Sequence, residues 1–261
     1  MTGLFKPAWM SKNEKKALKA VEKETDQNEL GNIANNAPIY KIRNIAAEKL
    51  SDENSILFVA IYTSDDDIFE MLSKKLSQSD MVRIAATTPY FKRSETIINT
   101  ITNQSEIAQI ARGAMHSGVR ILAIKKLTDQ PMLMDIVENE KDYKVRREAV
   151  KKLADQNFLA KIAMEDNLVE IEAVGALTDA DILREFEKGK GGPNISTMAR
   201  IKLTSDQSIL YEIAQNSNNY ALRAAAVTKL IDKTKLENIK MSCGNEMIRA
   251  AVEERLAELT G

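Results

Sequence analysis

The sequence has 261 residues with 44% hydrophobic and 29% charged side chains, and its net charge of −1 gives no overall preference for nucleic acid or an anionic membrane. Its only cysteine, Cys243, excludes an internal disulfide and a cysteine-based zinc site. Neither a signal-peptide pattern nor a run of roughly 18 apolar residues is present, so we expect a cytoplasmic protein with no membrane partner.

The first residues of the chain include Trp9 and Met10, two large apolar side chains ahead of a polar stretch. Repeat arrays have apolar ends that must be covered. We therefore predict that residues 1–11 form an N-terminal capping segment and that a leading helix follows near Lys12 to Glu24. Residues 12–261 are predicted to form one continuous repeat domain.

One motif then recurs nine times, with an Asp, Asn or Gln anchor and apolar residues four and seven positions later. Successive anchors are 24 to 27 residues apart, so the period is near 26. The anchors are Asp26, Asp52, Gln78, Asn103, Asp129, Asp155, Asp179, Asp206 and Asp232. A period this regular predicts a stacked array, and not a globule built around a central active site.

The unit from Asp129 to Leu153 shows what each repeat encodes. Asp129 is an N-cap signal, and Leu133 and Ile136 begin an apolar stripe at helical spacing. A polar break at 139–143 precedes a second stripe that ends at Leu153. Each unit is therefore predicted to be two helices of about ten residues. Apolar spacings of three and four, and not two, exclude a β-structure.

An alanine recurs four residues before the closing leucine of the second helix, which predicts a close approach of neighbouring helices. These alanines are Ala46, Ala123, Ala149, Ala173, Ala199 and Ala226. The glycine-rich stretch from Gly189 to Pro193 interrupts the repeat register, and we predict that it is the most mobile internal segment.

The stretch Val145-Arg146-Arg147-Glu148-Ala149-Val150-Lys151-Lys152-Leu153, followed by Ala154-Asp155-Gln156, resembles HEAT-like repeats of the armadillo-type α-solenoid superfamily. The resemblance covers roughly residues 12–258. It implies an all-α, right-handed α-solenoid of about nine short helix pairs. The units are shorter than the usual HEAT length of about 40–47 residues, so they resemble a short-repeat bacterial type.

A basic residue recurs just before the closing leucine of the second helix: Lys49, Lys75, Lys126, Lys152, Lys202, Lys229 and Arg255. Stacking would align this basic column as a track for phosphates or for an acidic partner. The alternative is structural, because cations at helix C-termini offset the helix dipole. No aromatic column accompanies the lysines, which argues against a track for single-stranded nucleic acid.

An arginine recurs at the second position of the second helix: Arg43, Arg120, Arg146, Arg223 and Arg249. This arginine ladder would either grip acidic ligands or bond to carboxylates and helix-end carbonyls of adjacent repeats. The rigid fork of five donors favours the structural interpretation.

We find no catalytic, cofactor-binding or metal-binding motif. His116 is the only histidine, and the run Lys188 to Pro193 lacks the residue order of a phosphate-binding loop. The sequence favours a non-enzymatic scaffold that binds a protein or peptide, of acidic character if the basic column is used, on the concave face built by the second helices.

Three alternatives stay open at this point. The first is a DNA-binding HEAT-like enzyme of the glycosylase type, which the charge balance and scarce aromatics make a poor match. The second is a pigment-lyase-like HEAT protein. The third is an array that dimerises through one end. The sequence does not define the oligomeric state.

Overall fold

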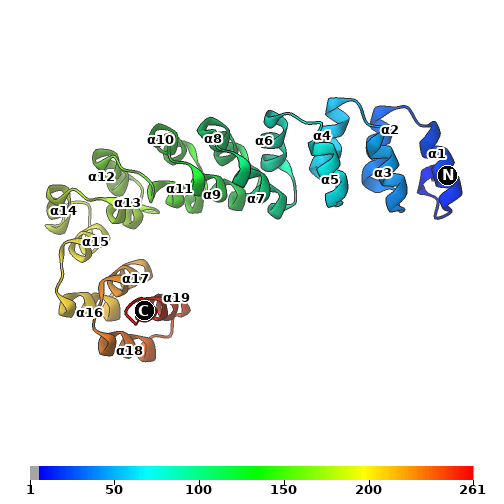
Figure 1. Cartoon of the computed structure of the whole chain (residues 1–261). Coiled ribbons are helices and arrows are strands. Elements are labelled where there is room, and N and C mark those ends of the chain that lie inside the picture. Colours follow the sequence, from blue (N-terminus) through cyan, green and yellow to red (C-terminus); the bar gives the residue numbers. More distant parts are fainter. Residues whose placement is uncertain (1–5, 261) are drawn as a thin grey trace, which may run out of the picture. The chain divides into compact units, whose positions relative to one another are not determined.

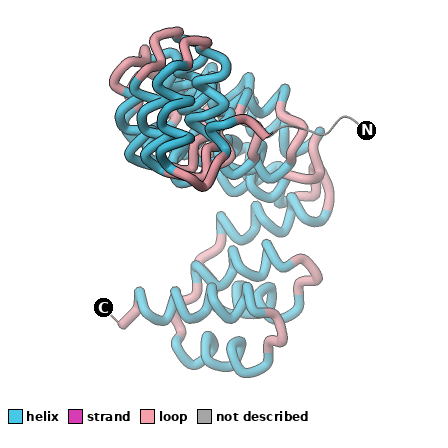
Figure 2. The backbone as a smooth tube through the Cα atoms, turned by 90° about the vertical axis from the view of Figure 1, so that its right-hand side faces the viewer, coloured by secondary structure: helices cyan, strands magenta, loops and turns pink. Residues whose placement is uncertain are grey.

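A computed structural model describes residues 6–260, and within that range the chain is built from α-helices, one short 3-10 helix and connecting loops (Figures 1 and 2). It divides into two compact units, Met1–Leu127 and Thr128–Gly261. Within the described residues no strand occurs, which confirms the predicted all-α class. Within the same residues no helix combines the length and apolar character needed to cross a bilayer.

The first unit contains a leading helix and four helix pairs. Its elements are η1 (Ala8–Met10), α1 (Glu14–Lys23), α2 (Gln27–Asn36), α3 (Tyr40–Glu48), α4 (Glu53–Tyr62), α5 (Asp66–Ser73), α6 (Gln78–Thr87), α7 (Phe91–Thr100), α8 (Gln104–Gly113) and α9 (Ser117–Lys126). In Figure 1 the first helices α2, α4, α6 and α8 form one row, and the second helices form another.

The second unit contains five helix pairs. Its elements are α10 (Gln130–Asn139), α11 (Tyr143–Val150), α12 (Gln156–Glu165), α13 (Glu170–Ala176), α14 (Ala180–Glu187), α15 (Pro193–Leu203), α16 (Gln207–Asn216), α17 (Tyr220–Lys229), α18 (Lys233–Ser242) and α19 (Glu246–Glu258). The described chain thus has one leading helix and nine pairs, as the period predicts. The right-handed course of the array stays a prediction.

The repeated anchors act as helix N-caps. In eight repeats the anchor side chain accepts a backbone N–H from the first turn of the first helix. The third repeat corrects the sequence interpretation, because Ser77, and not Gln78, caps α6. Ser77 and Asp80 form a reciprocal capping box. A short hydroxyl reaches the free N–H groups, whereas the longer glutamine is the first residue of the helix.

The core runs along the interior of each unit as columns of equivalent apolar residues. The predicted alanine column is fully buried in both units, with every member at 0% exposure. In the second unit Ala173 and Ala226 belong to α13 and α17, the second helices that pack on α15 and α19. Helices of about ten residues are marginal alone, so this stacking supplies their stability.

Two predicted special segments can be placed. Trp9 in η1 is 9% exposed, and its indole N–H donates to Glu29 at 2.6 Å. The capping role of residues 1–11 stays a prediction, and residues 1–5 lie outside the described residues. Gly189, Gly191 and Gly192 have φ values of +107°, +94° and +106°. This backbone region favours glycine, so the segment is a defined turn before α15; its mobility stays a prediction.

Candidate functional site

The basic column donates to backbone carbonyls one repeat back. Six of its members, three in each unit, reach the C-terminal end of the preceding helix in the row formed by α1 and the second helices. The acceptors are Val21 and Glu22 for Lys49, Glu48 and Leu50 for Lys75, Ile98 and Asn99 for Lys126, Gly175 for Lys202, Ile201, Lys202 and Thr204 for Lys229, and Leu230 for Arg255. These bonds satisfy carbonyls that a helix end leaves unpaired.

Burial also marks this column. The pKa values of Lys152, Lys202 and Lys229 are lowered, chiefly because burial disfavours the charged ammonium. An ammonium group that donates to carbonyls of the preceding repeat links the two repeats, which is a structural role. The role of the column as a partner-binding track stays a prediction.

The arginine ladder makes its contacts inside the array. Each member donates to a carbonyl at the end of the first helix of its own pair: Arg43 to Ala37, Arg120 to Ala114, Arg146 to Glu140, Arg223 to Ala214 and Arg249 to Cys243. Arg43 and Arg146 also pair with a carboxylate in the next repeat. Arg43 Nε lies 2.7 Å from Asp65 Oδ2, and Arg146 Nε lies 3.0 Å from Asp166 Oδ2.

A glutamine ladder was not foreseen from the sequence. The side-chain oxygen of Gln27 accepts the N–H groups of Ser51 and Asp52 at 2.8 and 3.1 Å. The equivalent glutamines bond in the same way to the loop of the following repeat: Gln130 to Ala154, Gln156 to Thr178 and Asp179, and Gln207 to Ile231. The signal was present, because each of these glutamines directly follows an aspartate anchor.

An exposed aromatic pair on α4 stands apart from the other first helices. Phe58 and Tyr62 are 43% and 51% exposed, and their ring centroids are 5.1 Å apart. A groove of about 250 Å³ lies beside Phe58 and is lined by uncharged polar groups of α2 and α4. Its lining residues are Asn28, Gly31, Asn32, Asn54, Ser55 and Phe58. Gly31 lies against Phe58, since a Cβ at Gly31 would lie in ordinary van der Waals contact, 3.7 Å from the Phe58 ring.

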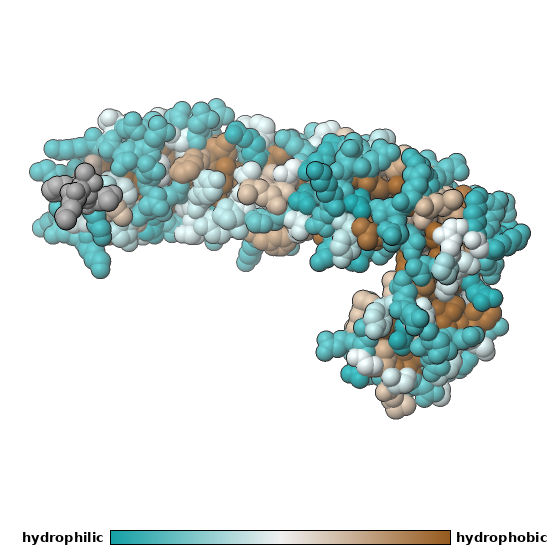
Figure 3. Space-filling view, turned by 180° about the vertical axis from the view of Figure 1, so that it is seen from behind, coloured by the Kyte–Doolittle hydropathy of each residue, from teal (hydrophilic) through white to brown (hydrophobic). Residues whose placement is uncertain are grey.

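The equivalent positions of the other repeats carry no apolar side chain. With each N-cap as reference, the residues that correspond to Phe58 are Asn32, Arg83, Gln109, Asp135, Lys161, Glu185, Glu212 and Asn238. Those that correspond to Tyr62 are Asn36, Thr87, Gly113, Asn139, Glu165, Gly189, Asn216 and Ser242. α4 alone therefore presents aromatic rings where the repeat pattern calls for a solvated surface. Figure 3 shows the mainly hydrophilic character of one face of each unit, with hydrophobic residues in separate patches.

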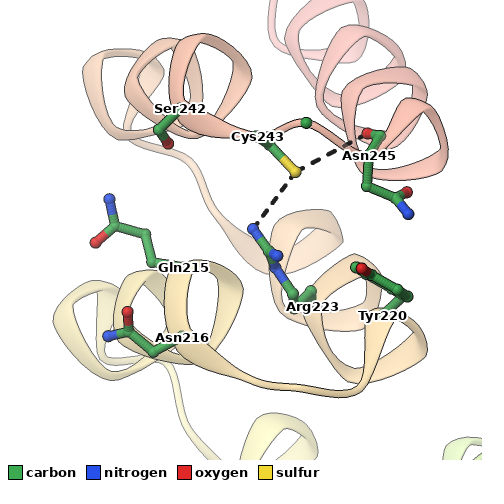
Figure 4. Close-up of a pocket in the computed structure, with 8 residues that line it drawn as sticks. Gln215, Asn216, Tyr220, Arg223, Ser242, Cys243 and Asn245 are labelled. Carbon is green, nitrogen blue, oxygen red and sulfur yellow. Dashed lines mark hydrogen bonds between the residues drawn. The ribbon is translucent and has the colours of Figure 1, made fainter.

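A second open pocket, of about 490 Å³, lies in the second unit around Arg223 and Cys243. Figure 4 shows the Arg223 guanidinium directed from α17 toward the sulfur of Cys243, with Gln215 on α16 to one side and Tyr220 to the other. Arg223 Nη2 donates to Cys243 Sγ at 3.5 Å. The rest of the lining is uncharged.

The remaining candidates carry no evident chemistry. His116 is exposed at the N-cap of α9 and makes no side-chain capping bond. Among the described residues no group of three or more His, Cys, Asp or Glu side chains could hold a metal ion. Comparison with models of protein families, with curated proteins and with solved structures gave no match. The assignment of a helical-repeat array therefore rests on the periodic helix pairs themselves.

Proposed function

We propose that the chain is a non-enzymatic scaffold of short HEAT-like repeats that binds a protein or peptide partner through the Phe58–Tyr62 pair on α4. The observation that carries the proposal is the exposure of two aromatic rings in tilted contact, at positions that are polar or glycine in the other eight repeats. Aromatic side chains lose little entropy on binding and bury a large area, so they are frequent anchors of protein interfaces.

The surroundings of the pair define the kind of partner. The adjoining groove presents amide and hydroxyl groups and no formal charge. Such a rim can hydrogen-bond to a peptide backbone, while the two rings receive one apolar side chain. The expected partner segment has one exposed apolar side chain as its anchor, with uncharged residues next to it. A track of basic residues is not needed for this mode, since the basic column is occupied between repeats.

The sequence predicted a binding surface on the second helices, whereas this proposal places the partner contact on α4, a first helix. Binding on the concave face stays a prediction without a specific contact to support it. Nothing among the described residues favours the glycosylase-type or pigment-lyase-like alternatives over this one.

The test is a peptide-library selection on the folded protein, repeated on the double variant Phe58→Asn/Tyr62→Asn. Asn32 and Asn36 hold these two positions in the preceding repeat, so the variant follows a substitution that the array already accommodates. We expect peptides with an apolar anchor to bind the wild type and to lose at least tenfold in affinity on the variant. Equal binding to both proteins would contradict the proposal.

Sedimentation of the same two proteins separates a foreign partner from a second copy of the chain. If the wild type self-associates and the variant does not, the aromatic pair is a homodimer contact and the proposal of a foreign partner is wrong.

A matched control replaces Tyr40 and Phe91, two aromatic side chains that are 45% and 49% exposed on second helices, and should leave peptide binding unchanged.

A further inference from the structure

Arg223 of the arginine ladder has no carboxylate partner among the described residues. Arg43 pairs with Asp65 through Nε and Nη2, and Arg146 pairs with Asp166 in the same way. The acceptors lie 22 and 20 residues after their arginines. For Arg223 the corresponding residues are Cys243 and Asn245, and neither carries a charge. A ladder position built for a carboxylate therefore faces a thiol.

The guanidinium of Arg223 keeps donors to spare. Its Nε donates to the carbonyl of Ala214 at 2.7 Å, and its Nη2 reaches Cys243 Sγ at 3.5 Å. A thiol sulfur is a weak acceptor. Nη1 and the second hydrogen of Nη2 have no partner among the described residues, and Arg223 forms no ion pair with them. This leaves one end of the guanidinium fork open to the pocket.

The pocket around this fork has room for a ligand group and contains no acidic side chain. Its volume is about 490 Å³, and neutral donors surround the arginine. The Asn216 amide and the Tyr220 hydroxyl form no hydrogen bond with the described part of the chain. An arginine in such a setting attracts an anion, because charge-assisted bonds are stronger than those between neutral groups.

We propose that this pocket binds a carboxylate supplied by a ligand, which takes the place that Asp65 and Asp166 occupy in the other repeats. Two observations favour a carboxylate over a phosphate. The chain already uses a carboxylate on the arginines at the equivalent positions, and the pocket lining holds only one cationic side chain. A planar carboxylate matches one guanidinium fork with one charge.

The carboxylate can come from a small free acid or from a peptide, as an acidic side chain or a C-terminus. A neighbouring pocket of about 610 Å³ shares Tyr220 and is lined by further uncharged polar residues, including Asn194 and Asn219. This second pocket extends the polar surface beyond the reach of a small acid. The proposal does not rest on the α4 surface, since the two sites lie in different units.

The experiment follows the Arg223 Nε–H resonance by NMR in the full chain while acetate is added at constant ionic strength. Acetamide and chloride serve as the neutral and simple-anion comparisons. A second series uses a tetrapeptide with a free C-terminus and the same tetrapeptide with an amidated one. We expect the resonance to move with acetate and with the free acid peptide, and to stay in place with acetamide and with the amidated peptide.

The decisive variant is Cys243→Asp, which places a carboxylate where Asp166 lies relative to Arg146 and should fold at least as well as the wild type. We expect it to bind acetate at least tenfold more weakly, because its own aspartate occupies the fork. Arg146→Met, at an arginine that already has its aspartate, should bind as the wild type does.

Three outcomes decide the proposal. A free acid peptide that binds at least tenfold more tightly than acetate supports it with a peptide as the source, and equal affinities support it with a small acid. A response to acetate no larger than that to chloride, or unchanged acetate binding by Cys243→Asp, would overturn it.

Discussion

Lys126 shows how one side chain can look like a binding residue in the sequence and serve another purpose in the fold. Its ammonium donates to the carbonyls of Ile98 and Asn99 at 2.7 and 2.6 Å. The position is basic in seven repeats, which is a pattern that either a binding track or a structural bridge would produce. The period alone could not separate the two, because the acceptors are backbone atoms of the preceding repeat.

We predict that Lys126→Glu lowers the free energy of unfolding by about 1.5–3 kcal/mol, the usual range for hydrogen bonds to a charged group. The new carboxylate would also face the negative end of α7. Lys23→Glu is the control, because it makes the same charge reversal in the exposed last turn of α1. It measures how much stability is lost when a negative charge is placed near the C-terminal end of the helix that carries it. Urea unfolding should show a clearly smaller loss for Lys23→Glu, and equal losses would contradict the bridging role.

Asp80 provides a prediction about pH. The hydroxyl of Ser77 is the main reason why the pKa of this carboxyl lies below its usual value of 3.8, and Arg83 adds to the effect. Since the folded-state pKa is below the unfolded one, the stabilisation is present above pH 3.8 and is lost as the pH falls through the folded-state pKa. We expect Asp80→Asn to cost stability near neutral pH, with a difference from wild type that shrinks below pH 3.8. A difference that does not depend on pH would show that the charge of Asp80 contributes nothing.

At the scale of the element, the sequence predicts the helices well because the signal repeats nine times. Caps, apolar stripes and polar breaks agree in each unit, so the pairs could be assigned from residue spacing alone. The one displaced boundary, at α6, arose because Gln78 fits the average spacing of the anchors while Ser77 has the side chain that can cap. Spacing gives the approximate position, and side-chain chemistry gives the residue.

The boundary of α6 can be tested by two alanine substitutions. Ser77→Ala removes the cap and should lower the free energy of unfolding by about 1 kcal/mol, within a usual range of about 0.5–2 kcal/mol. Gln78→Ala is the matched control one residue later and should change it much less. Thermal and urea unfolding of both variants would check this. If Gln78→Ala destabilised the protein more than Ser77→Ala, the assignment of Ser77 as the N-cap of α6 would be wrong.

At the scale of the whole molecule, an array of neighbouring contacts explains the fold without a central site. The lysine, arginine and glutamine ladders each join one repeat to the next within a unit. What the sequence did not predict is where the array departs from its own pattern. Phe58 and Tyr62 are exceptions in columns of polar residues and glycines, and Cys243 is an exception opposite an arginine. An average motif hides such exceptions, and the role of Cys243 becomes visible only when the fold shows which residue faces Arg223.

The most direct test of the account is NMR mapping of a selected peptide on the full 29.1 kDa chain. The account predicts that the backbone resonances which shift on binding belong to residues 28–32 and 54–62, along α2 and α4, and that Phe58→Asn/Tyr62→Asn abolishes the shifts. Shifts confined to the second helices α3 and α5, or shifts that persist in the double variant, would contradict it.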